Sequence, residues 1–179
     1  MSGKTVYILL FRGVGGATQL PVKPLREALT AAGFDNVGTY INSGNAFLRT
    51  GMPKAKMLET VARICRDEFG FTKEIHAPTL EEWRKVIENN PFPDAKEGKH
   101  LHAAWLDGEP KPNAVEALRA VCAEGEGIEI VGRVAYLHTP HGFGRSKLAE
   151  KFDKLIGVAN TARNWNTVLK LRELAEQAA

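Results

Sequence analysis

Hydrophobic positions in the first part of the chain alternate between strand-like runs and helix-like spacing. Residues 5–11 form a nearly continuous apolar run, which is typical of a strand buried on both faces. The next apolar residues recur at helical spacing and stop at Gly33, where a left-handed cap ends many helices. These residues predict a helix after the first strand: Leu25, Ala28, Leu29 and Ala32.

A hairpin, a second helix and a fourth strand complete this region. The turn sequence Asn42-Ser-Gly-Asn45 separates two strand-like segments and predicts a hairpin. An apolar stripe over residues 54–69 predicts a helix, and residues 71–76 predict another strand. The order β-α-β-β-α-β is that of the split βαβ, or ferredoxin-like, unit. We therefore expect a ferredoxin-like domain at residues 1–78.

A capping box and a linker mark the passage to the second half. Thr79 and Glu82 have the spacing of a capping box, in which each side chain accepts a hydrogen bond from the other residue's backbone N–H. Residues 89–99 contain prolines and a glycine, which are typical of a linker.

The second half starts as another β-α-β-β-α series. A strand over residues 100–106 is followed by a helix that Asn113 is expected to cap, and by a hairpin across Gly132-Arg133. Two helical stripes end the chain, without a clear strand between them. We therefore predict an α+β fold in which residues 79–179 form a second, related α/β unit. It carries two extra C-terminal helices and packs on the first unit.

Composition and charge leave the partner open. The chain has 179 residues, of which 44% are apolar and 25% charged. A globular chain of this length buries roughly 70% of its unfolded surface, so it needs no metal or disulfide to fold. The 24 Lys and Arg against 21 Asp and Glu give a formal charge of +3. This charge permits contact with a polyanion without requiring it.

The cysteines and the hydropathy profile indicate a cytoplasmic protein. Cys65 and Cys122 occupy apolar positions of predicted helices, so we interpret both as reduced core thiols. A reactive thiol, the alternative, needs nearby cations and access to solvent. No apolar stretch approaches the about 18 residues of a membrane span, and the N-terminus lacks a signal peptide pattern. We expect no membrane partner.

Three segments of the chain form a joint pattern. They are Leu10-Phe-Arg-Gly-Val-Gly-Gly16 with Leu20-Pro21, Thr39-Tyr-Ile-Asn-Ser-Gly-Asn45, and Arg145-Ser-Lys-Leu148 with Thr161-Ala-Arg-Asn-Trp-Asn-Thr-Val168. Taken together and in this order, they resemble the DUF1697 family of bacterial proteins over nearly the whole chain. The resemblance implies an α+β fold with ferredoxin-like character. It implies no established activity, and therefore no catalytic residues. The glycine loop in the first segment is shorter than the loop typical of the family.

The glycine loop after the first strand is a candidate anion site. In Arg12-Gly-Val-Gly-Gly16, closely spaced glycines allow backbone N–H groups to converge on a phosphate. The loop matches neither GxGxxG nor a Walker motif, and Leu20-Pro21 separates it from the following helix. The alternative is a tight structural turn, for which glycine is the usual residue.

Several predicted helices begin with cations, which the helix dipole disfavours at that end. Lys23 and Arg26 open the first helix, Arg145 and Lys147 flank Ser146 at the start of another, and Arg163 opens the last helix. A bound anion would stabilise these cations, whereas long side chains that extend into water are the alternative. We hypothesise that some of them bind a phosphate-bearing molecule or a nucleic acid. The candidate residues are Arg12, Gly13, Gly15, Gly16, Arg145, Ser146, Lys147 and Arg163.

Other motifs give weaker signals. Trp165 beside Arg163 could stack on a base, or could belong to the core. Ser43 and Ser146 fit a turn and a helix cap better than a nucleophile. The histidines lack a metal-binding spacing, and no cofactor motif is present. Two other hypotheses remain: an enzyme acting on a small acidic metabolite, and a protein-interaction or scaffold domain. The oligomeric state is open.

Overall fold

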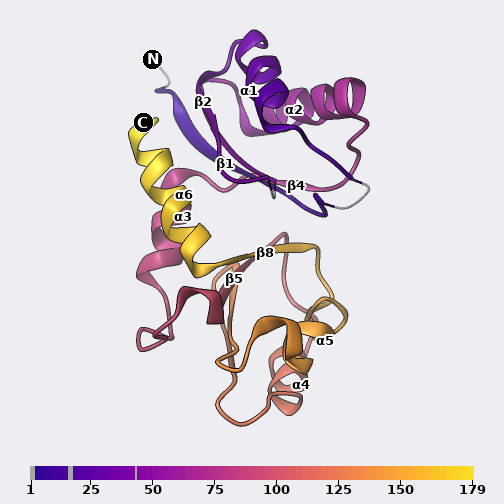
Figure 1. The fold of residues 1–179 in the computed structure, drawn as a ribbon, viewed down its shortest axis with the longest axis vertical. Coiled ribbons are helices and arrows are strands. Elements are labelled where there is room, and N and C mark those ends of the chain that lie inside the picture. Colours follow the sequence, from indigo (N-terminus) through magenta and orange to yellow (C-terminus); the bar gives the residue numbers. More distant parts are fainter. Residues whose placement is uncertain (1–2, 16–17, 43) are drawn as a thin grey trace. The chain divides into compact units, whose positions relative to one another are not determined.

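The computed structural model describes residues 3–15, 18–42 and 44–179 (Figure 1). The chain divides into two compact units. Unit 1 consists of Met1–Arg84 and Leu171–Ala179, and unit 2 consists of Lys85–Lys170. Both divisions fall within helices, α3 (Leu80–Glu88) and α6 (Trp165–Gln177).

Unit 1 contains a four-stranded antiparallel sheet in the order β2-β3-β1-β4. The strands are β1 (Thr5–Phe11), β2 (Asp35–Thr39), β3 (Asn45–Thr50) and β4 (Ile75–His76). Helices α1 (Val22–Ala31) and α2 (Lys54–Phe69) pack on the sheet through a common apolar core (Figure 1). The fold is therefore the ferredoxin-like one that the hydrophobic pattern predicts. The most deeply buried residues of the apolar core include Leu9, Phe11, Leu29, Leu48, Met57 and Val61.

Strand β4 is shorter than predicted. Only Ile75 and His76 pair with β1, whereas the strand was expected over residues 71–76. The reason lies in the end of α2: Gly70 has a positive φ of 66°, and the Phe71 N–H donates to the Cys65 carbonyl at 3.0 Å. Phe71 thus completes the helix cap, and its ring packs edge-on against Phe11.

The predicted capping box forms at the start of α3. The Thr79 N–H donates to Glu82 Oε2 at 2.8 Å, and the Glu82 N–H donates to Thr79 Oγ1 at 3.1 Å. Such reciprocal bonds satisfy backbone donors that the first turn of a helix leaves unpaired.

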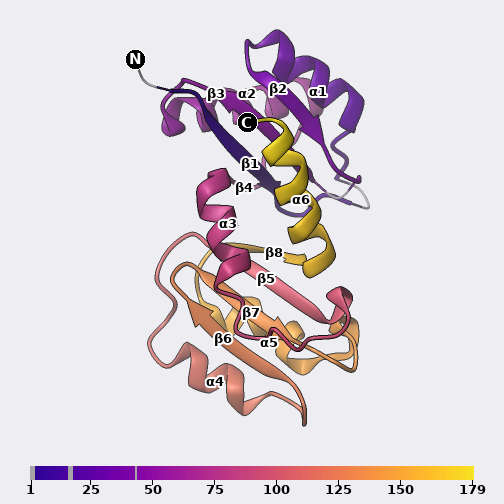
Figure 2. The ribbon, with the colours of Figure 1, turned by 90° about the vertical axis from the view of Figure 1, so that its left-hand side faces the viewer.

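Unit 2 has a second four-stranded antiparallel sheet, in the order β6-β7-β5-β8 (Figure 2). Its strands are β5 (Leu101–Leu106), β6 (Gly127–Val131), β7 (Val134–His138) and β8 (Asn160–Asn164). Helices α4 (Ala114–Ala120) and α5 (Lys147–Ile156) pack on it, and two short 3-10 turns cover Gly98–His100 and Phe143–Arg145. The strand order repeats that of unit 1, so both halves are ferredoxin-like.

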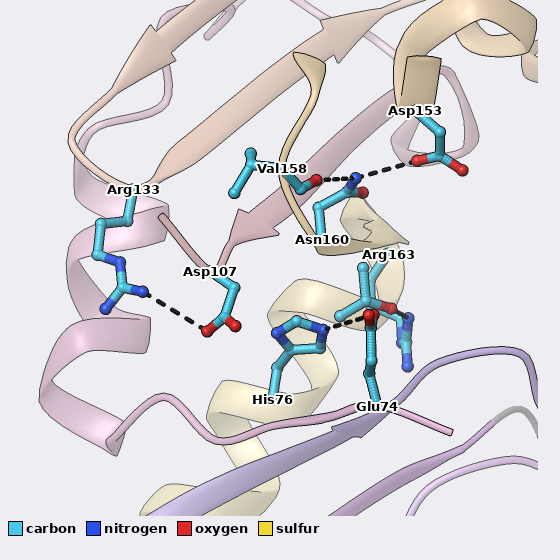
Figure 3. A network of polar contacts seen from close by, with 9 residues as sticks. Glu74, His76, Asp107, Arg133, Asp153, Val158, Asn160 and Arg163 are labelled. Carbon is cyan, nitrogen blue, oxygen red and sulfur yellow. Dashed lines mark hydrogen bonds and ion pairs between the residues drawn. The ribbon is translucent and has the colours of Figure 1, made fainter. Parts of the chain in front are cut away.

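Strand β8 is the main correction to the predicted fold. The prediction placed two extra helices at the end of the chain, but β8 lies between them and pairs with β5 over five residues. Helix α5 is therefore the second helix of a complete β-α-β-β-α-β unit, and only α6 is additional. The strand lacks an apolar pattern because one of its buried residues, Asn160, is polar. The Asn160 side chain donates hydrogen bonds to Asp153 at 3.0 Å and to the Val158 carbonyl at 3.2 Å (Figure 3).

Two further details differ from expectation. Asn113 precedes α4 as predicted, but it has a positive φ of 61° and its side chain makes no capping hydrogen bond. Arg163 lies within β8, opposite Ala103, instead of opening the last helix.

None of the helices among the described residues is long and apolar enough to span a membrane.

Candidate functional site

The residues predicted to bind an anion belong to both units. Arg12, Gly13 and Gly15 follow β1 in unit 1, and Gly16 lies outside the described residues. The other four belong to unit 2: Arg145, Ser146, Lys147 and Arg163.

The described part of the glycine loop uses its backbone donors within the chain. The Arg12 N–H donates to the Glu74 carbonyl at 3.0 Å, and the Gly15 N–H donates to the Thr18 carbonyl at 2.7 Å. Gly13 has a positive φ of 72°, and the Lys73 ammonium donates to its carbonyl at 3.4 Å. This geometry favours a tight structural turn, because these N–H groups are not available to a phosphate.

The start of α5 brings other predicted residues together. Ser146 is the N-cap, and its Oγ accepts a hydrogen bond from the Ala149 N–H at 3.2 Å. The Ser146 hydroxyl also donates to Glu126 Oε2, and Glu126 Oε1 accepts from the Ala123 N–H at 3.0 Å. Ser146 therefore acts as the predicted helix cap, and Glu126 links the segment after α4 to the first turn of α5.

A cavity of about 560 Å³ lies at this position, and we refer to it as the basic cavity. Two predicted residues, Arg145 and Lys147, line it together. Lys151 was not among the predicted residues, although its spacing from Lys147 places both on one helical face. The lining residues at the end of α4 and after it were not predicted either, because no sequence pattern connects them to α5. The lining residues are Ala120, Val121, Cys122, Ala123, Glu126, Arg145, Lys147 and Lys151.

The three cations of the basic cavity form no ion pair with the residues that the structure describes. In the described ranges, neither Arg145 nor Lys147 nor Lys151 has a carboxylate oxygen within 4.0 Å. Some other basic residues among those described do have such a partner. The paired ones include Lys4, Lys23, Arg66, Arg84, Lys99, Arg119 and Arg133. The basic cavity therefore has an excess of positive charge, with three cations and the one carboxylate of Glu126 in its lining.

Comparison with known proteins gives the family. The model described as "Protein of unknown function (DUF1697)" matches residues 4–136, about three quarters of the chain. The chain belongs to the DUF1697 family. The resemblance noted in the sequence is thus confirmed. The matched region ends before Arg145, so it includes the α4 wall of the basic cavity and excludes its three cations.

A solved structure supports the fold of this DUF1697 protein. The conserved bacterial protein SP0830 from Streptococcus pneumoniae is similar over 97% of this chain and 99% of its own, with a TM-score of 0.77. The two sequences are 20% identical, so the likeness concerns the fold alone. The search of curated proteins found no match.

The thiol in the cavity wall is held in its neutral form. Burial and the nearby Glu126 raise the pKa of Cys122, more than Arg119 lowers it, and its Sγ donates to the Leu118 carbonyl at 3.5 Å. A protonated thiol is a poor nucleophile. Burial also raises the pKa of Cys65, to about 12. Neither cysteine forms a disulfide, but Cys122 is only half-buried, in contrast to the predicted core position.

Other predicted cations lie outside the lining of the basic cavity. Arg163 donates from Nη1 to Thr161 Oγ1 at 2.7 Å and to the Ala162 carbonyl at 2.9 Å, and burial lowers its pKa to about 10. Lys23 lies 3.9 Å from Glu27, and Arg26 donates to Thr39 Oγ1 at 2.6 Å. For these residues, hydrogen bonds and ion pairs within the chain account for their positions.

The aromatic and histidine motifs have structural partners. Trp165 is half-buried and lies 6.4 Å from the ring of buried Tyr136. Asn164 caps α6 by accepting a hydrogen bond from the Thr167 N–H at 3.0 Å. His102 stacks on Phe143 with 3.9 Å between ring centroids. The described residues contain no group of His, Cys, Asp and Glu that could hold a metal ion.

Proposed function

We propose that this protein binds a phosphate-bearing ligand in the basic cavity of unit 2. The observation that supports the proposal is that Arg145, Lys147 and Lys151 line one cavity, with no carboxylate within 4.0 Å of them in the described chain. Close like charges repel one another, and a bound anion removes that repulsion. Arg145 can bind two phosphate oxygens with its planar guanidinium, and each lysine can donate to another oxygen.

The dimensions of the cavity favour a small ligand over a polynucleotide. Small-molecule sites commonly enclose about 300–1,000 Å³, and the basic cavity has about 560 Å³. A single-stranded nucleic acid instead needs an extended basic groove with aromatic side chains on which bases stack. The cavity is lined by no aromatic residue among those that the structure describes.

The proposal is tested by titrating the protein with inorganic phosphate, phenyl phosphate and a single-stranded oligonucleotide, using calorimetry. We expect the phosphates to bind with a weak dependence on salt. Binding of the oligonucleotide through many phosphates would instead weaken steeply as salt is added.

Two lysines of α5 provide a matched pair of variants. Lys151→Ala removes a cation of the cavity, and we expect about tenfold weaker binding of phenyl phosphate, the effect of losing one charge-assisted hydrogen bond. Lys154→Ala removes the same charge from the same helix outside the lining, and binding should stay unchanged. Equal effects of the two variants, or no binding of any phosphate by the unmodified protein, would disprove the proposal.

A further inference from the structure

One carboxylate shares the basic cavity with the three cations. Glu126 accepts hydrogen bonds from the Ala123 N–H and from the Ser146 hydroxyl, and Ser146 in turn caps α5. Both partners of Glu126 are neutral groups. The carboxylate is therefore fixed between the wall after α4 and the start of α5, and its charge remains part of the field inside the cavity.

The charges of the lining residues define the anion that fits best. Three positive side chains and one carboxylate give the lining a formal charge of +2. A phosphate monoester carries about −1.5 to −2 at neutral pH, because its second pKa is about 6. Its charge therefore matches that of the lining. A pyrophosphate carries more negative charge than the lining can neutralise, and the excess is repelled by Glu126.

The lining at the end of α4 and just after it is mostly apolar. Besides Cys122, it includes Ala120, Val121 and Ala123, whose side chains are small and offer no hydrogen bonds. Such a wall can contact an apolar group and cannot bind a second phosphate.

We infer that the ligand is a phosphate monoester with an apolar substituent, and that Glu126 disfavours anions of higher charge. The inference rests on the proposed function, because it assigns the ligand class of the same cavity. Arg145, Lys147 and Lys151 bind the phosphate, the alanine-rich wall contacts the substituent, and Glu126 sets the charge that the cavity accepts. A fixed like charge of this kind is a common way to reject a wrong ligand.

The test compares phenyl phosphate and pyrophosphate as probes, at constant ionic strength, in the unmodified protein and in Glu126→Gln. The unmodified protein should bind phenyl phosphate more tightly than pyrophosphate. In Glu126→Gln, the ratio of the two affinities should move toward pyrophosphate by at least about threefold, the effect of one unit charge several Å away even in a water-like dielectric.

Two further variants separate charge from structure. Glu150→Gln makes the same charge change in the first turn of α5 at an exposed residue outside the lining, and it should leave the ratio unchanged. Ser146→Ala removes the hydroxyl that binds Glu126 and keeps the carboxylate charge. It should lower the melting temperature while phenyl phosphate remains the preferred probe.

The outcomes distinguish the two proposals. Binding of neither probe by the unmodified protein refutes the proposed function, and the inference with it. Binding that depends on Lys151, together with a preference for pyrophosphate or a ratio that Glu126→Gln shifts no more than Glu150→Gln, refutes the inference alone.

Discussion

His102 illustrates how a single residue can link protonation to stability. Its ring stacks on Phe143, and its buried Nδ1 has no hydrogen-bond partner among the described residues. Burial lowers the pKa of His102 to about 4. The folded protein therefore favours the neutral imidazole, whereas the unfolded chain takes up a proton near the usual pKa of about 6.5.

We expect a pH-dependent loss of stability from this residue. The contribution of neutral His102 is fully present above pH 6.5, and it is lost as the pH falls through the folded pKa of about 4. The loss amounts to at most about 3 kcal/mol. Chemical denaturation at pH 7 and pH 4.5 measures it, and His102→Phe should reduce the difference. A pH dependence that His102→Phe leaves unchanged would contradict this explanation.

At the scale of elements, the hydrophobic pattern predicts those segments whose buried residues are apolar. Strand β1 and helix α2 follow this rule and lie at the predicted residues 5–11 and 54–69. Strand β8 does not follow it, because Asn160 and Thr161 are its buried residues and hydrogen bonds satisfy Asn160. Strand β4 was predicted too long because a helix cap occupies part of its segment.

The pairing of β2 with β3 depends on a glycine. Gly38 lies opposite Phe47, and a Cβ atom at Gly38 would come within 2.1 Å of the Phe47 ring. Gly38→Ala must displace this ring, and we expect a destabilisation of about 1–3 kcal/mol. Equilibrium denaturation measures the change. Gly51→Ala is the control, since its Cβ would lie 3.9 Å from the Lys4 side chain. A similar cost for both variants would contradict this explanation.

The candidate site could be predicted only in part, because it is a property of the whole of unit 2. The cations Arg145 and Lys147 are visible in the sequence as helix-start residues that the dipole disfavours. The segment Ala120–Ala123, at the end of α4 and just after it, lines the same cavity and comes close to these cations only after the unit has folded. Arg163 carries the same sequence signal, but hydrogen bonds within the chain explain its position.

Because unit 1 includes the C-terminal part of α6, a substitution there is expected to change the stability of unit 1. Leu171 and Ala175 are fully buried, and residues Leu171–Ala179 belong to unit 1. Within this unit the Asn36 side chain donates to the Ala178 carbonyl at 2.9 Å, and Arg84 pairs with Glu176 at 3.2 Å.

Leu171→Ala should therefore destabilise unit 1, by about 2–5 kcal/mol, through loss of buried apolar area and the cavity left behind. Hydrogen exchange measures the effect by region. We expect protection to decrease in β1 and β2, and the strands of unit 2 to retain more of theirs. A decrease confined to residues 85–170 would show that this part of α6 stabilises the other unit. The exposed Leu169 gives a matched control, because Leu169→Ala removes the same atoms from the same helix.

The discontinuous sequence of unit 1 also affects how the protein is made. A ribosome delivers the chain from residue 1 onward, so all of unit 2 emerges before the last segment of unit 1. The half that is synthesised first is thus the half that is completed last. Until residues 171–179 leave the exit tunnel, the nascent chain exposes the surface that those residues cover, which is the condition in which chaperones engage incomplete proteins.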